Sequence, residues 1–299
     1  MKVVIAGGTG ALGRRLADDL AERGHQVVVL TRSPGSGRHR EVRWDGRTVQ
    51  GWADELAGAA VVNLAGELVD RRPSPAAIEL LTSSRVEPTR ALAEAAAALD
   101  RPVPVWIQAS TLAIHGDAGE QLLDEGSPVA DGPPQMAGVA RAWEAAVAGV
   151  NTARTVLLRT SLVLDRDTPA LDRLTGLARW GLAGRIGSGR QWVSWIHISD
   201  WLAIVRWALD NPVHGVVVAS SPNPVRNAEL MAAVRHAVHR PVAPPTPGFA
   251  VRLGSVLLRS DPALALTGRR ARPARLLEAG FGFRYPQLAD ALAELLERR

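Results

Sequence analysis

From Val3 to Gly13 the chain reads Val-Val-Ile-Ala-Gly-Gly-Thr-Gly-Ala-Leu-Gly, an apolar run that leads into a glycine-rich turn. A helix-like segment, residues 14–23, follows directly. The glycines suit three tasks: an early glycine turns the chain tightly, Gly10 lets the backbone approach a pyrophosphate, and Gly13 lets helix and strand pack closely. A helix N-terminus offers N–H groups and a positive dipole end, so the order strand, turn and helix predicts a phosphate-binding turn.

The spacing of these glycines fits two dinucleotide-binding patterns, Gly-x-x-Gly-x-x-Gly from Gly7 and Gly-x-Gly-x-x-Gly from Gly8, so it does not select a subclass. A second apolar run at residues 27–30 stands where the second parallel strand of a β-α-β unit belongs. This context favours a cofactor site over the structural alternative, an ordinary glycine-rich turn. The residues expected to contact the cofactor here are Gly7, Thr9, Gly10, Ala11, Leu12 and Gly13.

The end of the second strand indicates which dinucleotide binds. An acidic residue about twenty positions after the glycines usually accepts a hydrogen bond from the ribose of NAD, whereas an arginine accommodates the extra phosphate of NADP. This strand ends in Thr31-Arg32-Ser33, and no carboxylate follows before Glu41. The guanidinium of Arg32 suits a phosphate, so the sequence predicts NADP as the cofactor. The alternative is that Arg32 is only a solvated surface arginine.

The composition restricts the class of protein. At 299 residues the chain is long enough for one large α/β domain with a smaller lobe. It contains no cysteine, which excludes disulfides, thiolate catalysis and cysteine-bound metals. Its 35 Lys and Arg residues are scattered among 30 acidic residues, so the net charge of +5 does not indicate a nucleic-acid partner.

We expect a cytoplasmic protein whose partner is a small-molecule substrate. The first strand begins at once, so no signal peptide is expected. No apolar run reaches the roughly eighteen residues of a membrane span, so no membrane partner is expected either. The sequence leaves a homodimer possible.

Apolar runs alternate with helix-like segments over residues 1–160, which predicts an α/β fold with a Rossmann-type, doubly wound parallel sheet and ligands at the carboxyl ends of its strands. The regularity loosens from Thr168. We therefore expect an NADP-binding Rossmann domain over residues 1–165 and a smaller C-terminal substrate lobe with a helical segment over 166–299, interleaved rather than independent. The expected strands are 3–6, 27–30, 41–45, 59–64, 103–109, 153–158, 192–197 and 215–219, and the expected helices are 14–23, 52–56, 75–99 with a break or kink near Pro88, 135–148, 200–209 and 227–238.

Motifs outside the glycine turn are more specific than the turn itself. They are Leu30-Thr31-Arg32, Val62-Asn63-Leu64-Ala65-Gly66-Glu67, Ser84-Arg85-Val86 with Thr89, Trp143-Glu144, Gly187-Ser188-Gly189-Arg190-Gln191-Trp192 with Trp195-Ile196-His197, and a C-terminal pattern from Pro273 to Pro286. With the glycine turn, they make the whole chain resemble the atypical extended short-chain dehydrogenase/reductases, an epimerase-like group of the NAD-dependent epimerase family that ends in a small domain of unknown function. The resemblance implies an NADP-binding Rossmann domain and adds Asn63, Ala65, Gly66 and Arg85 to the expected cofactor-binding residues.

The catalytic pair of ordinary members of this group is missing. Those members carry Tyr-x-x-x-Lys followed by a glutamate, and aligning Glu144 with that glutamate puts Met136 at the tyrosine position and Ala140 at the lysine position. The conclusion does not depend on the alignment, because the only tyrosine is Tyr285 and the only lysine is Lys2. The usual proton relay therefore cannot operate in this chain.

His115 and Thr111 are the residues expected to replace the relay. An imidazole titrates near neutral pH, and His115 stands just beyond the fifth expected strand. The alternative is that His115 caps a loop or packs at the strand end. Thr111 matches the serine or threonine that hydrogen-bonds the reacting group in ordinary members, and bound water is a third source of protons. We expect Glu144 to be structural and paired with an arginine.

Two further features have structural explanations. His197 and Asp200 could suggest a metal site, but their segment resembles the strand-to-helix junction of extended members, where Asp200 would cap a helix or hold loops together. We therefore expect no metal. Five of the nine tryptophans lie between residues 180 and 207, where core packing is the simplest explanation, although Trp180 and Trp192 would also suit a flat wall for a planar substrate.

Three classes of function follow from these residues. The leading hypothesis is an NADP(H)-dependent atypical short-chain reductase that acts on a small or medium organic substrate, with the cofactor supplying the hydride. A cofactor-binding sensor or assembly protein without turnover is the second. A non-redox isomerase, lyase or cyclase that reuses the cleft is the third.

Overall fold

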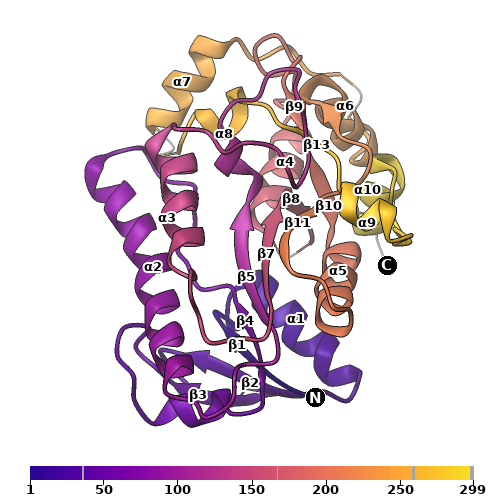
Figure 1. Cartoon of the computed structure of the whole chain (residues 1–299). Helices are drawn as coiled ribbons and strands as arrows, with labels where there is room; N and C mark the ends of the chain where they lie inside the picture. The colour runs from indigo at the N-terminus through magenta and orange to yellow at the C-terminus, as the bar shows by residue number, and fades with distance from the viewer. Residues whose placement is uncertain (36, 167, 241, 258–259, 297–299) are drawn as a thin grey trace.

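A computed structural model describes residues 1–35, 37–166, 168–240, 242–257 and 260–296. Seven parallel strands form one sheet in the order β11-β7-β5-β4-β1-β2-β3 (Figure 1). Their bounds are β1 (Lys2–Ala6), β2 (Gln26–Thr31), β3 (Arg40–Arg43), β4 (Ala60–Asn63), β5 (Trp106–Thr111), β7 (Thr155–Thr160) and β11 (Gly215–Ala219). The predicted α/β fold with a Rossmann-type parallel sheet is confirmed.

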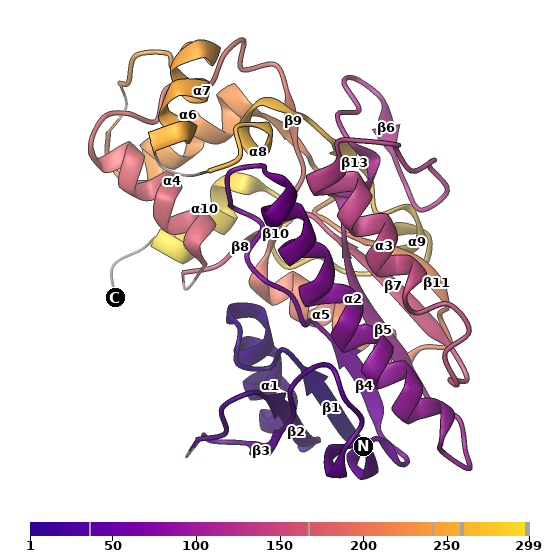
Figure 2. The ribbon, with the colours of Figure 1, turned by 90° about the vertical axis from the view of Figure 1, so that its left-hand side faces the viewer.

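Strand β1 shows how the sheet is buried on both faces. Val3 and Ile5 join a core cluster with α1 and α5, whereas Val4 and Ala6 join a second cluster with α2 on the opposite face. Figure 2 shows α2 crossing one face of the sheet with α3 beside it. The bounds of the elements in these layers are α1 (Ala11–Glu22), α2 (Pro75–Ala97), α3 (Val139–Ala145), α5 (Ile198–Asp210) and the 3-10 helix η1 (Gly51–Leu56). Because both faces are covered, the strands read as continuous apolar runs.

The C-terminal lobe lies beyond the carboxyl edge of the sheet, at the top of Figure 1. A separate apolar cluster, with Trp195 and Leu230 among its buried members, holds this lobe together. Strand β11 and helix α5 come from residues after 166 yet belong to the main sheet layers, so the boundary expected at residue 165 does not coincide with the end of the sheet. The lobe's helices are α4 (Pro169–Arg179), α6 (Asn227–Ala237), α7 (Gly248–Leu257), α8 (Ala263–Leu266), α9 (Ala274–Glu278) and α10 (Leu288–Leu296).

Short two-stranded pairings occur within the lobe and between the lobe and segments that follow strands of the sheet. Strand β6 (Leu122–Leu123) pairs with β13 (Arg270–Ala271), β8 (Leu162–Leu164) pairs with β10 (Trp195–His197), and β9 (Trp192–Val193) pairs with β12 (Val225–Arg226). The buried carboxylate of Asp200 adds a further connection, because it accepts hydrogen bonds from the backbone N–H groups of Arg284 and Tyr285, at 2.7 and 2.9 Å. The prediction that Asp200 holds loops together is confirmed.

Helix α2 runs continuously from Pro75 to Ala97, so the first of the two alternatives expected at Pro88, a break, is wrong. Proline removes one backbone hydrogen bond from a helix interior. Leu81 and Leu92, on either side of Pro88, are buried, so packing on the sheet maintains the helix across that loss.

Other elements differ from the predicted bounds. The strand expected at 192–197 is split at Ser194. The Ser194 hydroxyl donates to the Arg269 carbonyl and accepts from the Ala271 N–H, so the C-terminal segment is bound to the chain at this residue. The helix expected at 135–148 begins as the π-helix η3 (Pro134–Gly138) and ends with α3 at Ala145. The strands expected at 103–109 and 153–158 begin later, at Trp106 and Thr155. Just before them, Val103 and Thr152 form an isolated β-bridge. The C-terminal expectation extends over 297–299, which lie outside the described residues.

The described residues contain neither a membrane-spanning helix nor a cluster of metal-ligating side chains. None of the helices in the described ranges combines the length and the apolar character that crossing a bilayer needs. Nor do three or more His, Asp or Glu side chains gather there as metal ligands would.

Candidate active site

Three of the four glycines in the turn are required by packing within the protein. Gly7 has φ +77°, and a Cβ there would lie 2.8 Å from the carbonyl carbon of Leu64. A Cβ at Gly8 would lie 2.7 Å from a methyl group of Val29, and one at Gly13 would lie 2.3 Å from the Gly7 carbonyl oxygen. No side chain fits at such distances, so these glycines hold β1, α1 and the end of β4 together.

Gly10 differs because nothing in the described protein requires a glycine there. Its φ of −72° and ψ of 169° are open to any residue, and the one described atom within 4 Å of an added Cβ is the Gly7 carbonyl oxygen, at 3.3 Å. Gly10 precedes α1, and in the described chain neither a side-chain cap nor an acidic residue satisfies the first turn of that helix. The N–H groups at the start of α1 are therefore open to an anion beside Gly10. Exposed Thr9 and half-buried Ala11 and Leu12 complete this turn.

Asn63 lies buried beneath the neighbouring turn, which follows β4. Its Nδ2 donates to Thr89 Oγ1 at 2.8 Å and to Gln108 Oε1 at 3.1 Å, and its Oδ1 accepts from the Ala65 N–H at 3.1 Å. Both amide hydrogens are used inside the protein. The Asn63 side chain therefore fixes the position of the turn and does not support the direct cofactor contact expected from the sequence.

Arg85 fixes the same turn from helix α2. Its Nη1 donates to the Leu81 carbonyl at 3.0 Å, its Nη2 donates to the Glu67 carbonyl at 2.8 Å, and its guanidinium lies 5.1 Å from the centre of the Trp143 ring. Burial lowers the pKa of Arg85 to about 10, so it stays charged at neutral pH. A Cβ on Gly66 would lie 3.0 Å from the Arg85 guanidinium carbon, which explains the glycine there. Arg85 is thus a positioning residue for the Ala65-Gly66 turn.

Arg32 extends from the end of β2 into solvent, with 78% of its side chain exposed. Its Nη2 lies 3.8 Å from Glu67 Oε1, and the other oxygen of Glu67 accepts from Arg71 Nη2 at 3.0 Å. An exposed ion pair at this distance is weak. The guanidinium can therefore leave Glu67 for a more highly charged anion at little cost.

Side chains of β5, β7 and α3 form a polar cluster near the carboxyl ends of the two strands. Arg159 on β7 donates to both oxygens of Glu144, from Nε and from Nη2 at 2.9 Å each, and Ser110 Oγ donates to Glu144 Oε1 at 2.5 Å. The expectation that Glu144 is structural and paired with an arginine is confirmed. The third arm of Arg159, Nη1, lies 3.4 Å from His115 Nε2.

Both ring nitrogens of His115 are engaged inside the protein. Its Nδ1 lies 2.8 Å from the Pro128 carbonyl, which can only accept, so Nδ1 carries the hydrogen and Nε2 presents its lone pair to Arg159. Burial lowers the pKa of His115 below its usual value, and the charge of Arg159 lowers it further, against the opposing effects of the Pro128 hydrogen bond and Glu144. His115 is therefore neutral at pH 7 and has no proton on the nitrogen beside Arg159. This does not support the expected role of His115 as proton donor.

Thr111 is better placed for contact with a substrate. It ends β5 and is half-buried, and its Oγ1 accepts from the Ala113 N–H at 3.1 Å, which leaves its hydroxyl hydrogen to donate elsewhere. Met136 and Ala140, at the tyrosine and lysine positions, are both buried. The helix that would carry the relay thus presents apolar side chains there.

The sequence did not single out two arginines that the structure brings to this region. Arg159 is a charged residue within the apolar run of β7, and that contrast is a signal that could have found it. Arg269 is brought by the C-terminal segment, where its Nη2 lies 3.4 Å from Met136 Sδ. No local pattern distinguishes it from neighbouring arginines.

The flat apolar wall suggested for Trp180 and Trp192 is not available. The rings of Trp195 and Trp201 are buried in the core, whereas Trp180 is 83% exposed at the end of α4. Trp192 lies beneath two guanidinium groups, those of Arg226 and Arg270, at 3.8 and 4.6 Å from its ring centre. Its ring is therefore occupied by structural cation–π contacts.

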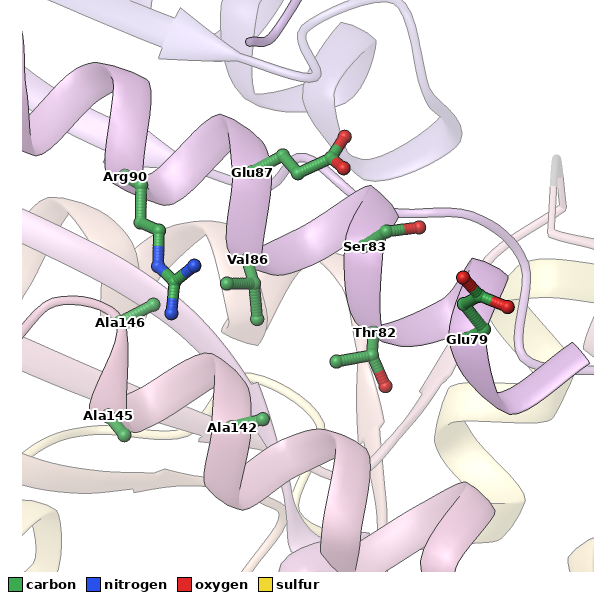
Figure 3. Close-up of a pocket in the computed structure, with 9 residues that line it drawn as sticks. All are labelled: Glu79, Thr82, Ser83, Val86, Glu87, Arg90, Ala142, Ala145 and Ala146. Atoms are coloured by element: carbon green, nitrogen blue, oxygen red, sulfur yellow. The ribbon is translucent and has the colours of Figure 1, made fainter. Parts of the chain in front are cut away.

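An open groove between α2 and α3 lies apart from the glycine turn. It measures about 640 Å³, and Figure 3 shows Ala142 of α3 facing Thr82 and Val86 of α2 across it. None of the residues discussed above for the cofactor or the chemistry lines this groove. We therefore locate the candidate site by the carboxyl ends of the strands, as expected for an open parallel sheet.

A parallel sheet with a glycine turn between β1 and α1, and polar residues at its carboxyl edge, defines a Rossmann-type α/β protein. Residues 3–161 match the NAD dependent epimerase/dehydratase family, and the chain belongs to that family. Residues 246–295 match a domain of unknown function, DUF1731. The resemblance inferred from the motifs is confirmed in both parts.

Relatives and solved structures cover nearly the whole chain. It is 34% identical to the human epimerase family protein SDR39U1 over 99% of this chain and 100% of the relative. A crystal structure of human SDR39U1 (isoform 2) with NADPH superposes with a TM-score of 0.88 at 33% identity, covering 100% of both chains. A nucleoside-diphosphate sugar epimerase from Corynebacterium glutamicum gives a TM-score of 0.79 at 30% identity, over 99% of this chain and 58% of that protein.

The state of His115 can be tested by NMR. We expect a His115 pKa below 6.5 in the native chain, with the hydrogen on Nδ1. In Arg159→Gln the pKa should rise, because the nearby cation is lost and the negative charge of Glu144 is no longer neutralised. Arg141→Gln, which removes an exposed arginine of the same helix as Glu144, should leave the titration unchanged. A His115 that titrates alike in all three proteins would contradict this arrangement.

Proposed function

We propose that the chain is an NADP(H)-dependent reductase of the atypical extended short-chain type, acting on a small or medium organic substrate. The observation that carries the proposal is the open space at Gly10. The other three glycines of the turn are explained by packing, whereas Gly10 leaves space free beside uncapped N–H groups of α1. A pyrophosphate is the group that such a space at a helix N-terminus suits.

The residues present fit NADP(H). The turn at Gly7 to Gly13 would hold the pyrophosphate, and the Ala65-Gly66 turn, fixed by Asn63 and Arg85, would let the cofactor pass close to the backbone. Arg32, exposed at the end of β2, would bind the 2′-phosphate. The NADPH in the crystal structure of the human relative supports the same cofactor here.

When bound, NADPH would supply a hydride to the substrate, and the reduced product would take up one proton. The chain's part in this step is positioning and hydrogen bonding. The Thr111 hydroxyl would donate a hydrogen bond to the group that gains negative charge, and water would supply the proton. His115 would support the strand end on which Thr111 lies, because its own nitrogens are engaged by Pro128 and Arg159.

One observation favours a second candidate function. Met136 and Ala140 carry no titratable group, so the positions of the usual relay are inert. A protein that binds NADP(H) as a sensor or assembly partner needs the cofactor cradle but no relay.

Incubation of the purified chain with NADPH and a metabolite extract tests these functions against one another. A substrate-dependent loss of nicotinamide absorbance is the result expected for a reductase. Tight NADPH binding without consumption would support the binding protein and overturn the reductase. A new product without net consumption of NADPH would point to an isomerase, lyase or cyclase.

Gly10→Val should abolish NADPH binding and leave the fold largely intact. The added side chain would fill the space left for the pyrophosphate, while its Cβ meets only one described atom, at 3.3 Å. Gly13→Ala is the matched control, because its Cβ at 2.3 Å from the Gly7 carbonyl oxygen should lower the free energy of unfolding by about 1–3 kcal/mol. Calorimetric titration and thermal unfolding separate the two effects. Normal NADPH affinity in Gly10→Val would place the cofactor elsewhere.

Arg32→Ala should reduce the preference for NADPH over NADH. The side chain is 78% exposed and competes with Glu67, so we expect a loss of about 1–2 kcal/mol, below the usual value for a charge-assisted pair. Arg38→Ala, an exposed arginine of the following loop, should leave the preference unchanged. The measurement is the ratio of the two dissociation constants in each protein. Equal affinity of the native chain for both cofactors would refute the assignment.

A further inference from the structure

Arg269 is a partly buried, charged side chain that forms no ion pair with the side chains that the structure describes. Its Nη2 contacts Thr267 Oγ1 at 3.1 Å and Met136 Sδ at 3.4 Å. Its Nε is buried and has no hydrogen-bond partner among the described residues. Burial lowers the pKa of Arg269, and the charge of Asp117 offsets this only in part.

The backbone around Arg269 is fixed on both sides. Its N–H donates to the Trp192 carbonyl at 2.9 Å, and its carbonyl accepts from Ser194 Oγ at 2.9 Å. The preceding Gly268 N–H donates to Asp117 Oδ1 at 2.9 Å. Strand β13 then pairs with β6. These backbone contacts fix the point from which the Arg269 side chain extends. The segment belongs to the domain of unknown function.

The position of Arg269 is next to the candidate chemistry. Met136, which its guanidinium contacts, stands where ordinary members of the family carry the catalytic tyrosine. The π-helix that bears Met136 packs against the 3-10 helix η2 (Leu112–His115), which directly follows Thr111. The charge of Arg269 also contributes to the lowered pKa of His115.

Two other arginines of the chain, one buried and one partly buried, have the partners that a structural role requires. Arg159 has a bidentate carboxylate partner, and Arg154 donates three hydrogen bonds to the carbonyls of Ala208, Leu209 and Val213. Such partners compensate the cost of removing a cation from water. Among the described residues, the Arg269 side chain has only a hydroxyl and a thioether as partners, so it lacks the carboxylate or carbonyl partners that the other two arginines have.

We propose that Arg269 binds a carboxylate group of the substrate, so that the C-terminal domain of unknown function supplies an anion-binding residue to the active site. This inference rests on the proposed function, because it names the substrate class of the same site. A guanidinium presents a planar pair of N–H donors that matches the two oxygens of a carboxylate. Nε, which lacks a partner, is one donor of such a pair.

The charges favour a monoanion over a phosphate. Arg269 is a single cation, and Asp117 lies near enough to offset part of its charge. The other arginine of this region, Arg159, is already neutralised by Glu144. A phosphate dianion would lack compensating charge here, whereas a carboxylate would be balanced.

Binding of simple carboxylates tests the inference without a known substrate. Acetate, pyruvate and benzoate would be titrated into the full chain with and without NADPH, each beside its neutral amide. We expect at least one carboxylate to bind more tightly than its amide, and Arg269→Gln to weaken it about 10- to 100-fold. Arg270→Gln, a neighbouring arginine that stacks on Trp192, should leave the binding unchanged. Inorganic phosphate should bind less well than the carboxylate.

A stability measurement separates a binding role from a structural one. Arg269→Met removes the buried charge, so the melting temperature without ligand should not fall. A clear loss of melting temperature, or carboxylate binding that is absent or independent of Arg269, would overturn the inference. Failure of the proposed function has a different signature, because it would appear as absence of NADPH binding or NADPH consumption in the native chain while the titrations without NADPH still report on Arg269.

Discussion

The contact between the start of α1 and the end of β1 is the constraint on which the rest of the site depends. Gly13 sits so close to the Gly7 carbonyl that no side chain fits between them, and Gly7 in turn lies against the backbone of the β4 turn. These contacts fix the direction of α1 and bring its N-terminus to the carboxyl edge of the sheet. Once that edge is set, parallel pairing brings the ends of β2, β4, β5 and β7 to the same side, where Arg32, the Ala65-Gly66 turn and Thr111 stand.

In this chain, which has a single lysine, arginine side chains form many of the hydrogen bonds between elements that lie far apart in the sequence. Arg85 and Arg154 donate to backbone carbonyls, which ties helix and loop ends to the sheet layers. A guanidinium has five N–H donors in a fixed plane, so one side chain can satisfy several carbonyls at once. Arg269 differs from these two arginines, because its Nε is buried without a hydrogen-bond partner among the described residues.

Local patterns predicted the sheet and the glycine turn because both depend on short-range sequence. The alternation of apolar runs and helical segments, and the spacing of Gly7 to Gly13, are each contained within about thirty residues of chain. The roles of Asn63, Arg85 and His115 could not be predicted in the same way. Their partners, Gln108, Trp143 and Arg159, come from other elements, so only the folded chain shows that these side chains are already satisfied. The split at Ser194 and the position of Arg269 depend on a contact between these two residues, which lie 75 positions apart in the chain.

The absence of the tyrosine and lysine relay changes which groups of the site can donate a proton or a hydrogen bond to a substrate. A tyrosine held by a lysine acts as a strong, positioned acid, whereas Thr111 offers only a hydroxyl hydrogen bond and His115 is held neutral behind it. In the proposed reductase, proton transfer from the protein would therefore contribute little rate acceleration, and orientation of the substrate would have to contribute more. Met136 and Ala140 offer a small molecule only dispersion contacts, which do not fix its orientation. A directional contact, such as a hydrogen bond, is needed for that. In the proposed reductase, the Arg269 guanidinium next to Met136 would supply such a contact, and it would compensate in part for the missing acid.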